Sequence, residues 1–255
     1  NSHYSIGKMG STLKVNNIVG TSGTSAPITL SGDTVTFTDG GKRLVATTSI
    51  TSTGSYTHNL NSLTTHIICW VQGAGGGGGG GDTTTRNGTG GGAGAFCIAK
   101  LDIVYATDST LTGSVGAGGT AGPATSGSGG TGGDSTVVWN SSNTITCSGG
   151  AGGIRAGGGA NLGGDGGTVT LANFTSLLSQ AGAKGRSNKN GSYNYGGSDG
   201  ADSFLGTGGI GASSAQDVFA SNGFGAGGGG GCGTGSATRA GGVGGNGTII
   251  IYEYI

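Results

Sequence analysis

The residue types that could perform catalysis are few in this sequence, and their spacing supports no catalytic centre. Three histidines are scattered along the chain, at His3, His58 and His66. No nucleophile, base and orienting group can be assembled around any of them. The aspartates fall mainly in turn-like sequence, where Asp commonly hydrogen-bonds its own backbone. Examples are Asp82, Asp102, Asp165, Asp199 and Asp202. We therefore expect no enzyme, with a carboxylate-pair polysaccharide depolymerase left as an unsupported alternative.

The cysteines form no metal-binding pattern. Cys69, Cys97, Cys147 and Cys232 lie far apart, and none has the C-x-x-C spacing that holds zinc or haem. Cysteine is among the most buried residue types, so we predict buried free thiols rather than disulfides. The glycine runs also lack the Lys-Ser/Thr ending of a phosphate-binding loop. We expect no metal, no nucleotide and no other cofactor.

The elements that must position these side chains are short apolar strands. Strand-like runs are predicted at residues 56–60, 66–71, 96–104, 135–139, 144–147, 168–171 and 248–254. Helix signals are nearly absent, because an interior glycine costs a helix about 1 kcal/mol relative to alanine. Only residues 173–180 suit a short turn of helix.

Composition limits the class of protein. Glycine supplies 66 of the 255 residues, charged residues make up only 9%, and the formal net charge is zero. Disorder usually combines low hydrophobicity with high net charge, so this composition favours a folded chain. Residues 93–101 interrupt any Gly-X-Y frame and exclude collagen. Neutral charge argues against nucleic-acid binding, and no apolar run approaches the roughly 20 residues of a membrane-spanning helix, so we expect no membrane insertion.

Glycine is concentrated in at least five blocks that separate the strands, at residues 73–81, 88–94, 116–133, 149–167 and 223–247. An ordered glycine run must pair its backbone groups with neighbours. Polyproline-II geometry, with about three residues per turn, allows this by close lateral packing. Because the blocks recur between strands, we predict an ordered lattice rather than flexible linkers. The predicted fold is all-β, a β-sandwich-like glycine-rich domain with polyproline-II-like strands.

The N-terminal part differs in composition from the rest. Residues 1–8 precede a natural-looking start at Met9 and are a candidate added segment. Residues 9–45 are rich in Thr, Ser, Val and Ile and predict a β-rich arm, whereas residues 46–255 form the glycine-rich domain. The predicted strands at 28–30 and 35–37 are too short to be stable alone. We expect three copies to wind together as a homotrimer.

Four segments carry a resemblance to a known family. They are Ile67–Gly76, where a strand runs into glycines; Gly113–Thr120; Gly129–Thr136; and Gly244–Tyr254, which ends in Tyr-Glu-Tyr. With these segments, residues 45–255 resemble the glycine-rich domain of bacteriophage tail-fibre and tail-tip receptor-binding proteins. The chain lacks the proline-containing segment that the family commonly has near residues 59–63, which leaves the subfamily open.

The resemblance implies a non-enzymatic component of the phage tail in the virion. Its partners would be a receptor on the host bacterial surface, either an outer-membrane protein or a glycan, and other tail proteins. The N-terminal segments Ser11–Ile18 and Gly23–Asp33 resemble the leading segments of many phage fibre proteins. They imply attachment to the virion or trimerisation.

Receptor contacts are expected where polar and aromatic residues interrupt the glycine. The best candidate is segment 186–195, followed by 215–219 and the pair Trp139 and Asn140. Tyrosine combined with Asn, Ser and Gly matches the composition of antibody binding loops. The predicted receptor-binding residues are Asn188, Asn190, Tyr193, Asn194, Tyr195, Phe219 and Trp139. Solvated turns of no specific function are the competing interpretation.

Three alternative functions remain open at this level. A purely structural virion protein, such as a fibre shaft or decoration, would have the same fold without a receptor. An ice-binding protein would need strict three-residue repeats, and those seen here are too interrupted. An enzyme acting on host polysaccharide would need the carboxylate pair that the sequence does not provide.

Overall fold

The computed structural model describes eleven stretches of the chain. They are residues 17–18, 28–31, 34–37, 43–82, 87–104, 109–124, 127–155, 162–187, 196–213, 218–233 and 238–255. The chain divides into two compact units, Asn1–Leu44 together with Ile255, and Val45–Tyr254. The predicted arm and its candidate added segment, residues 1–8, fall in the first unit, and residues 1–8 lie outside the described residues.

The first unit contains a small antiparallel sheet. Its strands are β1 (Asn17–Ile18), β2 (Ile28–Ser31) and β3 (Thr34–Phe37), in the order β1-β2-β3. Strands β2 and β3 confirm the two short strands that the sequence predicts here. Each has only four residues or fewer, which is short for an independently stable sheet.

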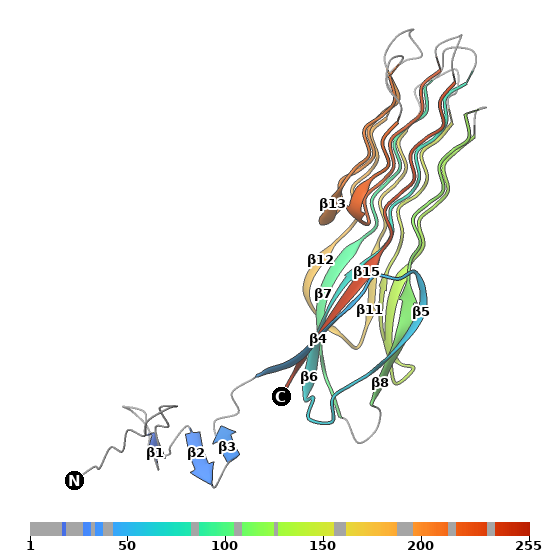
Figure 1. The fold of residues 1–255 in the computed structure, drawn as a ribbon. Coiled ribbons are helices and arrows are strands. Elements are labelled where there is room, and N and C mark those ends of the chain that lie inside the picture. Colours follow the sequence, from blue (N-terminus) through green and yellow to red (C-terminus); the bar gives the residue numbers. More distant parts are fainter. Residues whose placement is uncertain are drawn as a thin grey trace, which may run out of the picture. The chain divides into compact units, whose positions relative to one another are not determined.

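The second unit is built on two five-stranded sheets (Figure 1). One sheet has the order β12 (Thr175–Gln180), β7 (Phe96–Asp102), β6 (His66–Gln72), β15 (Thr248–Tyr254) and β4 (Leu44–Ile50). The other has the order β11 (Val169–Ala172), β10 (Asn143–Cys147), β9 (Ser135–Trp139), β8 (Thr110–Val115) and β5 (Gly54–Asn59). The all-β, sandwich-like fold expected from the sequence is confirmed, and β9 and β15 have the predicted bounds.

The hydrophobic core lies between the two sheets. Ile67, Cys69 and Val71 of β6 alternate inward, and Val137 and Ile145 meet them from the second sheet, all with no exposed surface. This two-residue alternation is what buries one face of a strand. All four cysteines are buried and free, as the sequence predicts.

The prediction of a helical turn at residues 173–180 is wrong. The described residues contain no helix, and this segment forms β12, which pairs antiparallel with β7. Leu178 lies opposite Ile98, and Gln180 lies opposite Phe96. Pairing with an existing sheet supplies the backbone hydrogen bonds that a helix would otherwise make, so tertiary context overrides a weak local preference.

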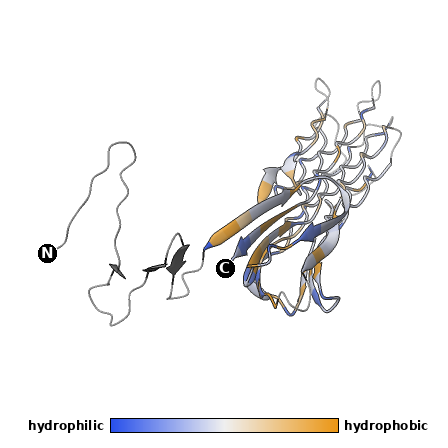
Figure 2. Cartoon of the chain, turned by 60° about the horizontal axis from the view of Figure 1, so that its bottom comes forward, coloured by the Kyte–Doolittle hydropathy of each residue, from blue (hydrophilic) through white to orange (hydrophobic). Residues whose placement is uncertain are grey.

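The glycine segments leave the sheets at one end and run side by side away from them (Figure 1). Two short strands, β13 (Leu205–Thr207) and β14 (Asn222–Phe224), pair within this region. In Figure 2 the strands of the sandwich carry both strongly hydrophobic and strongly hydrophilic residues, while the glycine segments are mostly pale, which marks intermediate hydropathy. The two ends of this unit are therefore held by different forces, apolar burial in the sandwich and backbone hydrogen bonding in the glycine lattice.

Candidate binding end of the glycine lattice

Segment 73–81 lies at the centre of the glycine lattice, and its N–H groups point in three directions in turn. Gly73, Gly76 and Gly79 donate to segment 88–95; Ala74, Gly77 and Gly80 donate to segment 127–133; and Gly75, Gly78 and Gly81 donate to segment 239–245, at 2.8–3.1 Å. A repeat of three residues is the period of a polyproline-II helix. The sequence prediction of polyproline-II-like strands therefore has its counterpart in the bonding pattern.

The carbonyl groups of the same segment bond to three further neighbours. The N–H groups of Gly150 and Gly153 donate to the carbonyl oxygens of Ala74 and Gly77. Those of Gly119 and Gly122 donate to Gly75 and Gly78, and those of Gly228 and Gly231 donate to Gly76 and Gly79. The central segment thus has six hydrogen-bonded neighbours and satisfies its backbone without any side chain. Each neighbour is bonded at every third residue, so successive residues of the central segment are held by different neighbours.

Glycine is required here because the backbones approach so closely. A Cβ atom on Gly78 would lie 1.8 Å from the carbonyl oxygen of Gly229, and one on Gly80 would lie 1.9 Å from that of Pro123. Among the described glycines, only Gly54, Gly223 and Gly225 have a positive φ. Most lattice glycines therefore serve close approach and not an unusual backbone conformation.

Six interruptions of the described chain fall at the end of the lattice that is far from the sandwich. The flanking residues are 82 and 87, 124 and 127, 155 and 162, 187 and 196, 213 and 218, and 233 and 238. Hydrogen bonds tie these flanks together, for example from the N–H of Gly81 to Arg239 O at 3.0 Å and from the N–H of Gly80 to Gly127 O at 2.8 Å. The lattice therefore holds six chain exits at one end.

Five of the predicted receptor-binding residues fall in one of these interruptions. Asn188, Asn190, Tyr193, Asn194 and Tyr195 lie outside the described residues. The two arms that flank them are joined, because the Arg186 guanidinium lies 3.2 Å from the Asp199 carboxylate. The N–H of Arg186 also donates to Asp199 O at 3.1 Å. The base of this segment is therefore fixed on both sides.

The structure separates the two remaining predicted residues. Phe219 is 54% exposed and lies on the lattice, where its N–H donates to Ile210 O at 3.1 Å. Trp139 is only 6% exposed and belongs to the core between the sheets. It ends β9 at the edge of the sandwich away from the lattice, since β9 begins two residues after lattice residue Gly133. Trp139 is thus corrected from a surface contact to a core residue, and Phe219 stays available.

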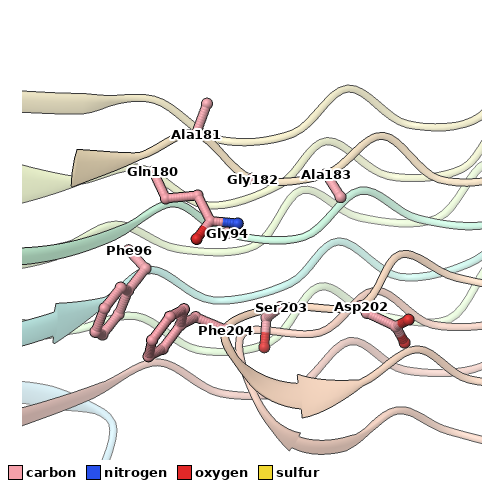
Figure 3. A pocket seen from close by; sticks show the side chains of 9 residues that line it. All are labelled: Gly94, Phe96, Gln180, Ala181, Gly182, Ala183, Asp202, Ser203 and Phe204. Atoms are coloured by element: carbon pink, nitrogen blue, oxygen red, sulfur yellow. The ribbon is translucent and has the colours of Figure 1, made fainter. Parts of the chain in front are cut away.

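A shallow pocket lies where the lattice meets the sandwich (Figure 3). Phe96 and Phe204 stack there with ring centroids 4.1 Å apart and planes 6° from parallel. The polar groups nearby are engaged in shaping the chain, because Asp202 Oδ1 accepts from the Gly208 N–H at 2.7 Å and Ser203 Oγ donates to Phe224 O. This arrangement supports chain geometry and provides no reactive pair.

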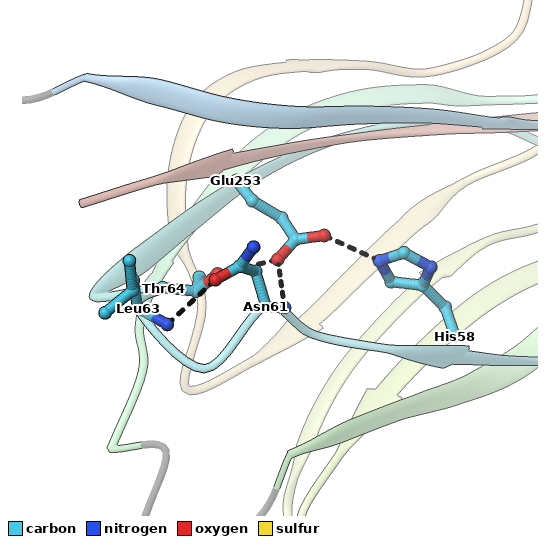
Figure 4. A network of polar contacts seen from close by, with 5 residues as sticks. All are labelled: His58, Asn61, Leu63, Thr64 and Glu253. Carbon is cyan, nitrogen blue, oxygen red and sulfur yellow. Dashed lines mark hydrogen bonds and ion pairs between the residues drawn. The ribbon is translucent and has the colours of Figure 1, made fainter.

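A buried carboxylate stands apart from the lattice, at the edge of the sandwich (Figure 4). Glu253 of β15 is 2% exposed. Its Oε1 lies 2.9 Å from His58 Nε2, and its Oε2 accepts from Thr64 Oγ1 at 2.6 Å and from the Asn61 N–H at 2.8 Å. The side chain of His58 belongs to β5 of the opposite sheet, so the carboxylate bridges the two sheets.

Charge and hydrogen bonding stabilise the ionised form of Glu253. Burial by itself raises the pKa of this carboxyl, but hydrogen bonds from Thr64, Asn61 and His58, with the charge of His58, bring the pKa below its usual value. The sequence analysis missed this group, although Glu253 is the only glutamate in the chain. The hydrogen bond between His58 and Glu253 joins β5 to β15 and thereby gives this pair a structural role.

No group of three or more His, Cys, Asp or Glu side chains in the described stretches is placed to hold a metal ion. None of the described residues forms a helix of the length and apolar character that crossing a membrane requires.

Comparison with known proteins gives one positive result. A family model described as a glycine-rich domain matches residues 48–254, which is nearly the whole of the second unit. A search of curated proteins found no match to the chain. The matched region includes the complete glycine lattice and both sheets apart from the first residues of β4.

Proposed function

On the premise that the chain belongs to the glycine-rich domain family, we propose that it is a non-enzymatic bacteriophage tail protein that binds a receptor on the surface of the host bacterium. The observation that carries this proposal is the convergence of six chain exits on one end of a hydrogen-bonded lattice. Binding residues concentrate on loops that rigid elements hold in place. A lattice in which the central segment is hydrogen-bonded to six neighbours is such an element.

The chemistry around one exit suits recognition of a polar surface. The segment between Ser187 and Gly196 is rich in Tyr and Asn, and its base is tied by the Arg186–Asp199 ion pair. Tyrosine gives rigid contact area at low entropic cost, and asparagine adds hydrogen bonds. An outer-membrane protein loop or a surface glycan would present complementary donors and acceptors. Phe219 adds an exposed aromatic ring on the same lattice.

The remaining parts of the proposal concern the virion. The sequence resemblance of the N-terminal segments to phage fibre proteins supports attachment of the first unit to other tail proteins. In this arrangement the lattice end faces the host and the chain acts in the tail during adsorption. A purely structural shaft or decoration is the competing role within the virion.

The direct test is binding of the purified full chain to a panel of candidate host bacteria, with inhibition of phage adsorption as the second readout. We expect saturable binding that blocks adsorption. The double variant Tyr193→Ala and Tyr195→Ala should bind at least about 30-fold more weakly, since interface tyrosines often contribute more than about 1 kcal/mol each. The control is Leu63→Ala, an exposed residue in the turn before β6, away from the lattice.

Two outcomes would contradict parts of this proposal. Absence of binding and of blocking with every host would favour a purely structural virion protein. Full binding by the double tyrosine variant would remove segment 188–195 as the contact while leaving the adhesin role in place.

A further inference from the structure

The outer face of the sheet that contains β6 carries an apolar row across four strands. Register places Leu178 of β12 opposite Ile98 of β7, Ile98 opposite Trp70 of β6, and Trp70 opposite Ile250 of β15. Residues directly opposite on neighbouring strands share one face of a sheet. These four side chains therefore form a continuous band, and none of them is fully buried.

Aromatic residues extend this band on both sides. The Trp70 and Tyr252 ring centroids are 5.8 Å apart, and those of Trp70 and Phe96 are 6.1 Å apart. Ile68 lies opposite Tyr252 in the next row. We call the surface formed by Ile68, Trp70, Ile98, Leu178, Ile250 and Tyr252 the outer apolar face.

The second sheet provides an internal comparison, because its outer face has a different composition. Val138 of β9 lies opposite Thr112 of β8 and Thr144 of β10, and the next row contains Ser114, Thr136, Thr146 and Thr170. Threonine and serine are typical of a sheet face in contact with water. The same domain therefore has one outer face suited to solvent and one composed of Ile, Leu, Trp and Tyr.

The strands of the first sheet are also apolar on their inner side. Ile67, Cys69 and Val71 of β6 and Ile249 and Ile251 of β15 have no exposed surface. Strands that are apolar on both faces are the pattern of a sheet covered on both sides. The main contacts of β6 and β7 outside their own sheet are with β9 and β10, which lie on the inner side. Phe204, stacked on Phe96, covers only one end of the outer face.

We propose that the outer apolar face is the interface through which this chain associates with a second copy of itself. The charged side chains on this face are Lys100 and Asp102, which pair with each other at 2.7 Å. The face therefore carries no net charge that would select a partner of opposite sign. Strand spacing and rise give the whole five-stranded sheet, β4 included, roughly 550 Å² of outer surface, so a pair of copies would bury at most about 1,100 Å². That area is close to the threshold of about 1,000 Å² for a biological interface and fits a weak association that dissociates on dilution.

The short strands of the first unit also favour association with a second copy of the chain. Its strands β1, β2 and β3 have two to four residues each, too short for a sheet that is stable alone. Association of copies through the second unit would bring several such arms together. A single face that pairs with its own copy joins two chains, so the homotrimer expected from the sequence stays a separate prediction.

The first experiment uses the unaltered full chain over a wide concentration range. Analytical ultracentrifugation should give a multiple of the 24.0 kDa chain mass that dissociates on dilution. Amine-reactive labelling supplies a matched pair of probes, because Lys100 and Lys184 are both ion-paired at 2.7 Å with an aspartate. Lys100 should be protected at high concentration and label on dilution, whereas Lys184, on the lattice, should label equally at both.

The second experiment uses matched variants of outward-facing β-strand residues. The double variant Ile98→Thr and Ile250→Thr retains β-branched side chains and should weaken self-association by at least about 30-fold, because each of the two interface contacts contributes more than about 1 kcal/mol. Val138→Thr, on the outer face of the other sheet, should leave association unchanged. Far-ultraviolet circular dichroism checks that each variant is folded.

Three results would overturn this interface. A monomeric mass at every concentration would show that the chain does not self-associate through this face. Protection of Lys100 that does not change with dilution would assign the covering to the chain's own N-terminal unit. A folded double variant that associates as strongly as the unaltered chain would place the interface elsewhere. None of these outcomes depends on receptor binding, so the two proposals fail independently.

Discussion

Glu253 shows how a single residue can link the two sheets. It is the only glutamate of the chain, it is buried on β15, and its carboxylate bonds to His58 of β5 and to the turn that precedes β6. Burying a carboxylate is costly unless hydrogen bonds replace the lost water. The bonds from His58, Asn61 and Thr64 supply that replacement and hold the C-terminal strand in register.

We predict that Glu253→Gln destabilises the chain by about 2 kcal/mol near neutral pH, because hydrogen bonds to a charged group are lost. The pKa of Glu253 is lowered on folding from its usual 4.5. The unfolded chain therefore takes up this proton first as the medium is acidified. The stabilisation is complete above pH 4.5 and is lost as pH falls through the lowered pKa of the folded state.

Urea unfolding between pH 7 and pH 3 measures this prediction. The difference in unfolding free energy between the unaltered chain and Glu253→Gln should shrink toward acid pH. Asp165→Asn serves as the control, since its ion pair with Lys184 is exposed and should contribute less than about 1 kcal/mol. A difference that is constant with pH would show that the charge of Glu253 does not matter.

At the scale of elements, the glycine segment is the unit that distinguishes this fold. A β-strand pairs with two neighbours in a plane, whereas segment 73–81 bonds with six. Three residues per turn direct successive N–H groups to different neighbours, so a bundle grows in all lateral directions. This geometry gives a rigid support with little hydrophobic core, and it leaves side chains to its outer surface and its end.

We predict that Gly78→Ala destabilises the lattice by about 3 kcal/mol, in the upper range for overpacking. Its Cβ would lie 1.8 Å from the carbonyl oxygen of Gly229, in the interior of the bundle. The smaller entropy of an unfolded alanine offsets only about 0.4–1 kcal/mol of this cost. Thermal unfolding should show the loss.

The control for this substitution is Thr131→Ala, an exposed residue on the neighbouring segment 127–133. It should change stability by less than about 0.5 kcal/mol. Equal stability of Gly78→Ala and the unaltered chain would mean that the bundle can open at its centre without cost.

At the scale of the whole second unit, four free thiols report on both of its ends. Cys69, Cys97 and Cys147 lie in the sandwich core, and Cys232 lies in the lattice. Burial raises the pKa of Cys69 and Cys232, and the pKa of Cys147 is raised first by its hydrogen bond with Cys97 and then by burial. The same hydrogen bond lowers the pKa of Cys97, but the Cys97 side chain has no exposed surface. Cys69, Cys147 and Cys232 react slowly because the thiolate is the nucleophile, and burial shields all four thiols from a reagent.

We predict that an aromatic disulfide reagent labels none of the four thiols rapidly at pH 7.5, and all four after unfolding in guanidinium. A separate faster phase for one thiol would identify local opening at the lattice, where Cys232 is located, ahead of the sandwich. Fewer than four labelled thiols in the unfolded chain would indicate a disulfide and contradict the free state described here. Spectrophotometric counting of released thiolate gives the number directly.

Local patterns in the sequence were sufficient for the class of fold. Alternation of apolar and polar residues is a property of adjacent positions, so strands such as 135–139 and 248–254 were predicted with their observed bounds. Recurrence of glycine blocks between those strands indicated ordered packing. The buried state of the cysteines followed from residue type. Each of these inferences needs only neighbouring residues.

Features that join distant parts of the chain were decided by the tertiary structure. Glu253 and His58 are 195 positions apart, and no local pattern relates them. Trp139 is a core residue and residues 175–180 are a strand because other strands lie beside them. The sequence determined which segments are strands and which are glycine blocks, because that information is local. Only the folded structure decided which faces and segments meet, because register between remote strands sets the neighbours of every side chain.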